Sequence, residues 1–227
     1  INNIIKKTYQ HYTFLIFEFM RQKFTNINSL KINIDDKTRE ILSSKNGFIL
    51  MTAHLGNWEL IVKILNLYKK STIVVKEQRN LGGDRFVCEA RSGKNIVLIK
   101  TKESKRKMVQ AITSGHILGL ASDQNADMKG TKIKFFGKET SVPKGAAFFH
   151  HKTRAPIAVG FCILNDNYSY DFSLRYISNI NINHNIENLF KDIGGKFSLA
   201  LEAKIKEKPE QYFWFHRKWD RKIYKKH

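Results

Sequence analysis

His54 and Glu59, within the segment GFILMTAHLGNWE, are the residues whose types and spacing most directly suggest chemistry. In one continuous helix, side chains five residues apart lie about 140° apart around the axis, so this pair could meet only across a junction between two elements. The run FILMTA is typical of a strand, Gly56 permits a tight turn, and Asn57 is a favourable N-cap. We therefore expect His54 at the carboxyl end of a strand and Glu59 in the next helical turn, where its carboxylate can reach the imidazole.

Such a pair would act as a general base. A carboxylate bonded to one ring nitrogen of His54 fixes the tautomer and raises the basicity of the other nitrogen. The sequence has no GxSxG segment, and no histidine lies near Cys88 or Cys162 in the sequence. The pattern therefore favours attack by a substrate hydroxyl on an activated carbonyl such as a thioester. A purely structural interpretation also fits, in which Glu59 complements a helix dipole and His54 is a hydrogen-bonded strand-end residue.

Short β-rich runs alternate with helix-like segments from residue 47 onward. This alternation predicts an α/β fold, with a single mixed, mostly parallel sheet flanked by helices. The last two runs, separated by NDN, are expected to form a hairpin. We expect one domain over residues 1–227, because no internal repeat or low-complexity linker is found. The expected strands are FILMTA, TIVVK, NIVLIK, ILGLAS, KIKFFG, PIAVGFCIL and YSYDFSLRYI, and the expected helices span 58–70, 81–92, 102–114, 143–153 and 186–206.

The charge of the chain is strongly positive. The 227 residues include 40 Lys and Arg against 20 Asp and Glu, a formal net charge of +20. This balance favours anionic partners, namely nucleic acid, an anionic membrane surface or an acidic protein. Two cysteines without a CxxC pair indicate a reducing compartment rather than a disulfide framework. No apolar run reaches 18 residues, and the first residue, Ile1, leaves room for a preceding leader or anchor.

Both ends of the chain carry features that suit a membrane surface. Residues 1–45 are expected to be a helical segment, with a helix over 4–24 whose apolar face is unusually wide. That face either packs on the domain or contacts a membrane interface. At the other end, a basic tail suits either an anionic membrane or simple solubility. Its residues are Lys218, Arg221, Lys222, Lys225 and Lys226.

Four segments in the same order resemble the lysophospholipid acyltransferase superfamily, and in particular the late (lauroyl/myristoyl-type) acyltransferases of bacterial lipid A biosynthesis. HLGNWE matches the H-x4-(D/E) signature, and VVKEQRNLGGDRFVCEAR, SDQNADMKGTKIKFFGKETSVPKGAA and PEQYFWFHRKW resemble later blocks. The resemblance covers residues 45–219. It departs at Lys76 and Glu77, where that branch commonly has Arg-Pro, and a lysine loses the bidentate geometry of arginine. Members of the family usually begin with a hydrophobic anchor, which is not found in this sequence.

The resemblance implies an O-acyltransferase. It would move a fatty acyl chain from acyl carrier protein, or from coenzyme A, to a hydroxyl of a lipid A precursor. His54 would remove the hydroxyl proton and Glu59 would hold His54, with no metal and no cofactor beyond the acyl thioester. The expected partners are acyl carrier protein, the anionic precursor and the membrane surface. The expected location is the cytoplasmic face of the bacterial inner membrane, with peripheral attachment or a preceding anchor.

Further site residues follow from the matching blocks. For the arginines the alternative is a solvated surface charge, and for Asp123 and Gln124, which end a predicted strand at the same edge as His54, it is a plain turn. Four phenylalanines could line an acyl channel, although a place in the core is the simpler interpretation, and His216 is expected to be structural. The implied substrate-binding residues are Asn57, Lys76, Arg79, Arg91, Asp123 and Gln124, and the phenylalanines are Phe135, Phe136, Phe148 and Phe149.

Two other functions remain open from the sequence. The acceptor could be another lipid or a glycolipid. The chain could also be a basic nucleic-acid-binding domain, although no helix-turn-helix, zinc finger, RNP-type strand or KH-type segment is found. The distribution of charge separates these readings, because a stripe along one face favours nucleic acid and a collar around a cleft favours acyl transfer.

Overall fold

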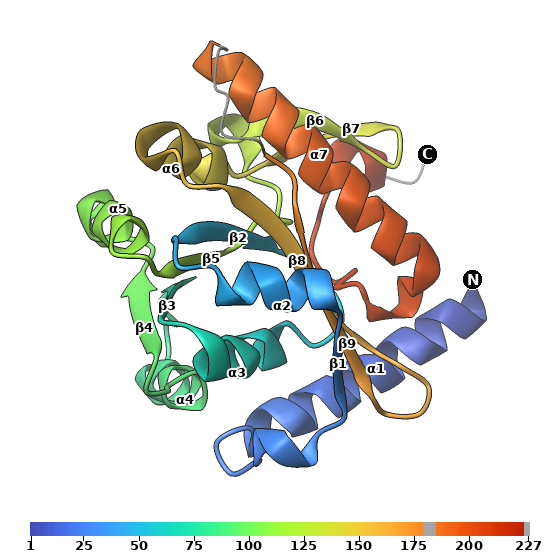
Figure 1. The fold of residues 1–227 in the computed structure, drawn as a ribbon. Helices are drawn as coiled ribbons and strands as arrows, with labels where there is room; N and C mark the ends of the chain where they lie inside the picture. The colour runs from blue at the N-terminus through green and yellow to red at the C-terminus, as the bar shows by residue number, and fades with distance from the viewer. Residues whose placement is uncertain (179–184, 225–227) are drawn as a thin grey trace.

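A seven-stranded sheet runs through the protein with helices on both of its faces (Figure 1). The computed structural model describes residues 1–178 and 185–224. Neighbouring strands are parallel except for the last two along the chain, which form the expected hairpin. The predicted α/β class and mostly parallel sheet are therefore confirmed. In order across the sheet, the strands are β1 (Ile32–Ile34), β9 (Tyr170–Tyr176), β8 (Ile157–Leu164), β2 (Phe48–Thr52), β5 (Ile117–Ala121), β3 (Ser71–Val75) and β4 (Ile96–Lys100).

The two faces of the sheet bury separate sets of apolar side chains. Phe48 and Leu50 of β2 pack toward α2 (Asp36–Ser43) and α3 (Trp58–Tyr68), whereas Ile49 and Met51 pack with α5 (Lys105–Thr113), α6 (Gly145–Thr153) and α7 (Ile186–Glu207). A strand covered on both faces needs a continuous apolar run, which is why FILMT was recognisable from the sequence. The remaining helices are α1 (Asn2–Arg21) and α4 (Leu81–Ala90).

Two strands were not expected from the sequence. The strand β1 lies inside the segment 1–45, which was expected to be helical and does contain the helices α1 and α2. The strand β6 (Thr131–Phe135) pairs with an unpredicted strand, β7 (Lys138–Val142), in a separate two-stranded sheet. β1 has three residues and KETSV is polar, so neither carries a clear apolar period. The sheet is therefore not single, because this hairpin stands apart from it.

The helix α1 packs on the domain, as one of its two interpretations required. Leu15 and Tyr12 are buried, and the Tyr12 ring contacts Trp58, Phe213 and Phe215. Apolar side chains nevertheless remain on the exposed side of the helix, so its apolar face is wider than the domain covers. Among the helices of the described residues, none is long and apolar enough to cross a membrane.

Candidate active site

His54 and Asp123 meet because β2 and β5 are parallel neighbours. Thr52 at the end of β2 lies opposite Ala121 at the end of β5, so the residues that follow leave the sheet side by side. Nδ1 of His54 lies 2.8 Å from Oδ1 of Asp123. The Asp123 side chain is 0% exposed and that of His54 is 23% exposed. A buried carboxylate at this distance fixes the tautomer with the proton on Nδ1 and leaves Nε2 free to accept a proton.

The electrostatics of the pair match this arrangement. Burial lowers the pKa of His54, but the hydrogen bond and negative charge of Asp123, together with the charge of Glu59, outweigh it and raise the pKa above its usual value. Burial raises the pKa of Asp123, but the hydrogen bond and charge of His54 outweigh it and lower that pKa. Each group therefore stabilises the charged form of the other. The imidazole is a stronger base than an isolated histidine.

Glu59 has other partners, which corrects the expectation that it holds His54. Nε and Nη2 of Arg91 donate to the two carboxylate oxygens of Glu59 at 2.7 and 2.5 Å, and Nε1 of Trp58 donates to Oε1 at 3.0 Å. The second residue of α3 points toward α4, at whose end Arg91 stands, so the bidentate guanidinium takes the carboxylate. Glu59 acts on His54 through its charge, and the hydrogen-bond partner of His54 is Asp123.

A cavity of about 410 Å³ begins at His54 and Glu59 and runs between the sheet and α3. Its inner wall is apolar and comes from β2, β3, β5 and α3. Leu50 lies four residues before His54 along β2, which corresponds to about 13 Å of strand. A polar mouth and an apolar interior of this length suit a molecule with a reactive polar end and a long apolar chain. The apolar lining includes Leu50, Ile61, Val62, Leu65, Ile73 and Leu120.

Gly119 lies in the inner part of the wall of this cavity. It lies opposite Leu50 on one side and opposite Ile73 on the other, so three neighbouring strands contribute to one row. A Cβ atom at Gly119 would lie 2.8 Å from Cδ1 of Ile73. A side chain at Gly119 would therefore push the end of the Ile73 side chain out of its present place in the wall of the cavity.

The other expected site residues fall into different places. Lys76 and Gln124 are exposed and line the mouth of the cavity, and Arg91 lines it while paired with Glu59. Arg79 is exposed and is not part of the lining. Asp123 lies beneath His54 rather than in the lining. The structure therefore brings Lys76, Arg91 and Gln124 to the cavity of His54, but not Arg79.

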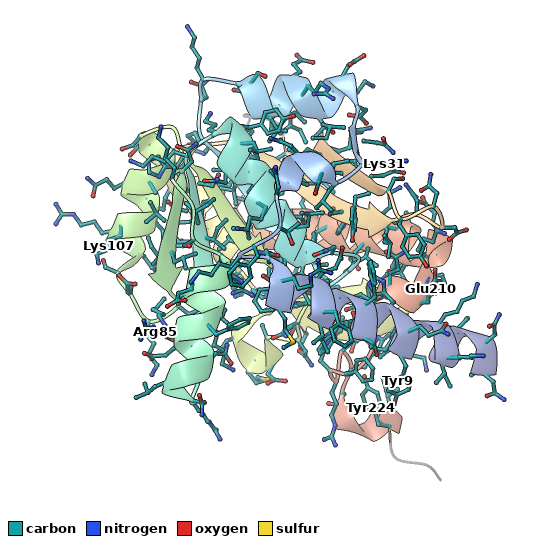
Figure 2. The ribbon with its side chains drawn as sticks, turned by 90° about the horizontal axis from the view of Figure 1, so that it is seen from below. Tyr9, Lys31, Arg85, Lys107, Glu210 and Tyr224 are labelled. Atoms are coloured by element: carbon teal, nitrogen blue, oxygen red, sulfur yellow. The ribbon has the colours of Figure 1, made fainter. Side chains whose placement is uncertain are left out.

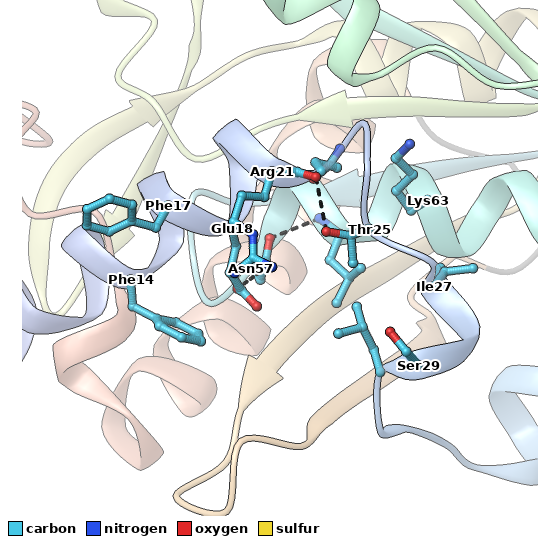
Figure 3. A pocket seen from close by; sticks show the side chains of 12 residues that line it. Phe14, Phe17, Glu18, Arg21, Thr25, Ile27, Ser29, Asn57 and Lys63 are labelled. Atoms are coloured by element: carbon cyan, nitrogen blue, oxygen red, sulfur yellow. Dashed lines mark hydrogen bonds between the residues drawn. The ribbon is translucent and has the colours of Figure 1, made fainter.

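Asn57 lies in a second, adjacent cavity of about 250 Å³. Its Oδ1 accepts the backbone N–H of Leu60, which caps α3, and its Nδ2 donates to Oε2 of Glu18 at 2.8 Å. Figure 3 shows Glu18 and Asn57 beside each other in this cavity, near Arg21. The expected substrate-binding amide is thus engaged within the protein, between α1 and the start of α3.

Two expectations about the second half of the chain also have a structural outcome. Phe135 and Phe149 are core residues, and Phe136 and Phe148 pack against the same core. None of these four phenylalanines lines the cavity of His54. Lys218, expected in the basic tail, is instead buried near Asp123. Lys225 and Lys226 of that tail lie outside the described residues.

No group of three His, Cys, Asp or Glu side chains within residues 1–178 and 185–224 could hold a metal ion.

Comparison with known proteins identifies the family. A family model for bacterial lipid A biosynthesis acyltransferases matches residues 2–221. The chain belongs to this family. The protein is therefore an acyltransferase, and the resemblance found in its sequence is confirmed. The match begins within α1 and ends after the closing segment that carries Lys218.

Other comparisons add little about this acyltransferase. No curated protein matches its sequence. Among solved structures, it is similar to the crystal structure of the 1-acyl-sn-glycerophosphate (LPA) acyltransferase PlsC from Thermotoga maritima, with a TM-score of 0.44 and 10% sequence identity. The similarity covers 91% of this chain and 78% of that chain. A likeness at this level carries no weight for the site.

Proposed function

We propose that this acyltransferase moves a fatty acyl chain from a thioester donor, on acyl carrier protein or on coenzyme A, to a hydroxyl of a lipid A precursor. The observation that carries the proposal is the His54–Asp123 pair at the mouth of an apolar cavity. His54 can accept a proton there while an acyl chain lies in the cavity beside it. Membership of the lipid A acyltransferase family supports the choice of acceptor.

The transfer is a direct attack without an acyl-enzyme. The acceptor hydroxyl gives its proton to Nε2 of His54 as its oxygen attacks the thioester carbonyl, and Asp123 stabilises the imidazolium that forms. When the tetrahedral intermediate collapses, the C–S bond breaks and His54 returns the proton to the leaving sulfur. The donor departs as a free thiol. Burial raises the pKa of the Cys162 thiol, and neither Cys162 nor Cys88 lines the cavity, which supports a route without a cysteine nucleophile.

Glu59 and Arg91 have a supporting role in this mechanism. The Glu59 charge favours the protonated form of His54, which is the form that develops as the hydroxyl loses its proton. Arg91 keeps this carboxylate in place with two hydrogen bonds. The Arg91 guanidinium also lies 5.9 Å from the ring of Phe19. The helix α1 therefore supports the Glu59–Arg91 pair as well as the core.

Contact with the cytoplasmic face of the bacterial inner membrane is also part of the proposal, and the apolar surface of α1 supports it. Ile5, Tyr9, Ile16 and Met20 are exposed along one side of this helix. Large apolar side chains at helical spacing beside basic residues are typical of interfacial helices. A bilayer-embedded acceptor would then reach the enzyme without leaving the membrane.

The positive charge of the protein is compatible with anionic lipid and an acidic carrier protein as partners. Figure 2 shows Arg85 and Lys107 on one side of the molecule and Lys31 on another. A single basic stripe would be expected of a nucleic-acid groove. A net charge of +20 suits adsorption to an anionic surface.

The test is transfer by the purified protein. Labelled acyl thioester, carried by acyl carrier protein or by coenzyme A, is offered with a lipid A precursor or with lysophosphatidic acid in detergent, and products are weighed by mass spectrometry. We expect the precursor to gain one acyl chain and His54→Ala to lose transfer. His116→Ala is the matched control, because His116 precedes β5 and bonds Thr72 at the other end of the sheet.

Three results would contradict parts of the proposal. Acylation of lysophosphatidic acid in preference to the precursor would assign another acceptor. A wild-type rate of transfer by folded His54→Ala would show that His54 is not the general base. A stoichiometric acyl label that survives denaturation, formed without acceptor, would replace direct attack by an acyl-enzyme.

A further inference from the structure

Lys218 is a cation buried behind the Asp123–His54 pair. It is 2% exposed, and its ammonium donates a hydrogen bond to the main-chain oxygen of Asp123. The same ammonium lies 5.1 Å from the ring centroid of Phe135. The backbone around it is clamped to β7, since Thr140 donates its hydroxyl to the Lys218 carbonyl and forms a bridge with Trp219. The segment that looks like a basic tail therefore delivers one lysine into the interior.

Asp123 needs a nearby positive charge because its carboxylate is removed from water. Its Oδ1 is bound by His54, whereas Oδ2 has no hydrogen-bond partner among the described residues. Burial lowers the pKa of His216, so that ring is mostly neutral near pH 7. Burial also lowers the pKa of Lys218, to about 8, which still leaves most of its ammonium protonated at that pH. The titratable groups that interact with Asp123 are His54, His216, Lys218, Tyr12 and Tyr212.

We propose that Lys218 is a positioning residue for acyl transfer, because its buried ammonium holds the Asp123 carboxylate ionised and in place beneath His54. This proposal rests on the function proposed above, in which His54 is the general base. The hydrogen bond to the main-chain oxygen fixes the turn that follows β5. The charge favours the carboxylate over the carboxylic acid, and only the carboxylate keeps the proton on Nδ1 and Nε2 free.

The position of Lys218 argues for an action through Asp123. Its donor contact goes to Asp123, whereas the groups that act on the charge of His54 are Asp123, Glu59, Arg91 and His216. A lysine kept only for solubility would be exposed, as the neighbouring Arg217 is. Burying an ammonium is unfavourable unless partners compensate it, and here the Asp123 oxygen, the Asp123 charge and the Phe135 ring do so.

The experiment is an NMR titration of His54 in the whole protein, which needs no substrate. Histidine-labelled wild type, Lys218→Met and Arg217→Met are compared, and the His54 signals are assigned with His54→Gln. In Lys218→Met we expect the tautomer with the proton on Nδ1 to lose its dominance and the pKa of His54 to fall, because the turn that carries Asp123 is no longer fixed by the hydrogen bond from Lys218. Arg217→Met is the matched control, since it removes an adjacent exposed charge, and it should leave both signals unchanged.

Other outcomes overturn the proposal. An unchanged pKa and tautomer of His54 in folded Lys218→Met would show that the lysine does not support Asp123. A raised pKa of His54 would show that Lys218 acts through its charge, which opposes protonation of the imidazole, and not by holding Asp123 in place. If Lys218→Met does not fold, wild type decides the matter, since loss of the Lys218 proton should move the His54 signals a second time near pH 8. No second step would sink the idea.

Activity supplies an independent readout. Loss of a group that orients a catalytic side chain typically costs about 10- to 100-fold in activity. We expect kcat of Lys218→Met to fall by that factor with KM nearly constant, because Lys218 does not line the cavity. If wild type transfers no acyl chain at all, the proposed function fails, while the titration of His54 still decides the role of Lys218.

Discussion

Replacing Asp123 by asparagine tests which carboxylate holds His54. The substitution keeps the size of the side chain and removes its charge. A hydrogen bond to a charged group contributes about 1.5–3 kcal/mol and a neutral one about 0.5–1.5, so the lost charge alone weakens stabilisation of the imidazolium by about 1–1.5 kcal/mol, roughly tenfold in rate. The asparagine amide can also donate to Nδ1, which moves the ring proton to Nε2 and blocks proton acceptance. A general base contributes about 10²–10⁴, so we expect kcat to fall within that range.

Glu59→Gln is the matched comparison. It removes the other carboxylate at the mouth of the cavity but leaves the bond between Asp123 and His54 intact. Because the tautomer of His54 is unchanged, we expect kcat of Glu59→Gln to stay about tenfold or more above kcat of Asp123→Asn. Both variants are assayed as folded protein with the same donor and acceptor, and kcat and KM are measured separately.

The pH profile gives the prediction a second readout. His54 must be neutral to accept a proton, and its pKa is raised above 6.5 mainly because Asp123 outweighs the effect of burial. The acid limb of kcat/KM should therefore lie above pH 6.5 in wild type and move to lower pH in Asp123→Asn. The reasoning is refuted if Glu59→Gln, rather than Asp123→Asn, moves this limb and loses the larger part of kcat.

The same pair should also make the stability of the fold depend on pH. A histidine whose pKa is higher in the folded than in the unfolded protein contributes stability that is fully present below pH 6.5 and is lost as pH rises through its folded value. Asp123→Asn should therefore lower the melting temperature more at pH 6 than at pH 8.5. An equal loss at both pH values would show that the asparagine disturbs packing instead.

Three further predictions concern the cavity, the second ion pair and the surface. Gly119→Ala should shift acyl preference toward shorter chains in a competition assay. Each methylene excluded from an apolar site costs about 0.8 kcal/mol, which is roughly a fourfold change in preference. An unchanged preference would show that the acyl chain binds elsewhere. Arg91→Met should lower the free energy of unfolding by about 3–5 kcal/mol in urea melts, because it leaves the Glu59 carboxylate buried without its partner, whereas exposed Arg79→Met should change little. Ile16→Ser should weaken binding to anionic vesicles without lowering the melting temperature, and wild-type binding should weaken as salt rises, because charges are screened over about 10 Å at 0.1 M.

The central strands were predictable and the edge elements were not. FILMT and ILGLA are buried on both faces, so each reads as an apolar run long enough to identify a strand. The three residues of β1 pair only with β9 at the edge of the sheet, where little burial is required. The polar strand β7 exists because it pairs with β6. The first strand therefore depends on a partner far along the chain and the second on its neighbour in a hairpin, and in neither case does the strand's own residue pattern record the pairing.

The candidate site was predictable as a location but not as a set of contacts. The sequence placed His54 and Asp123 at the same edge of a sheet, yet the order of strands was not readable, so their adjacency was missed. The five-residue spacing made Glu59 the evident partner of His54, while Arg91 lies much further along the chain. Lys218 looked like one of several tail lysines, because its burial depends on Phe135 and Thr140 of the β6–β7 hairpin.

The two carboxylates near His54 differ in what surrounds them, and this difference divides their roles. Asp123 is fully buried and its Oδ1 binds Nδ1 of His54, while the ammonium of Lys218 bonds the main-chain oxygen of the same residue. Both carboxylate oxygens of Glu59 accept hydrogen bonds from Arg91. The positive charge of that guanidinium lowers the pKa of His54 and so partly offsets the effect of the Glu59 charge. A carboxylate paired with arginine contributes less to the stabilisation of an imidazolium than Asp123, which bonds the ring itself. Glu59 also connects the start of α3 to Arg91 at the end of α4, at the mouth of the cavity.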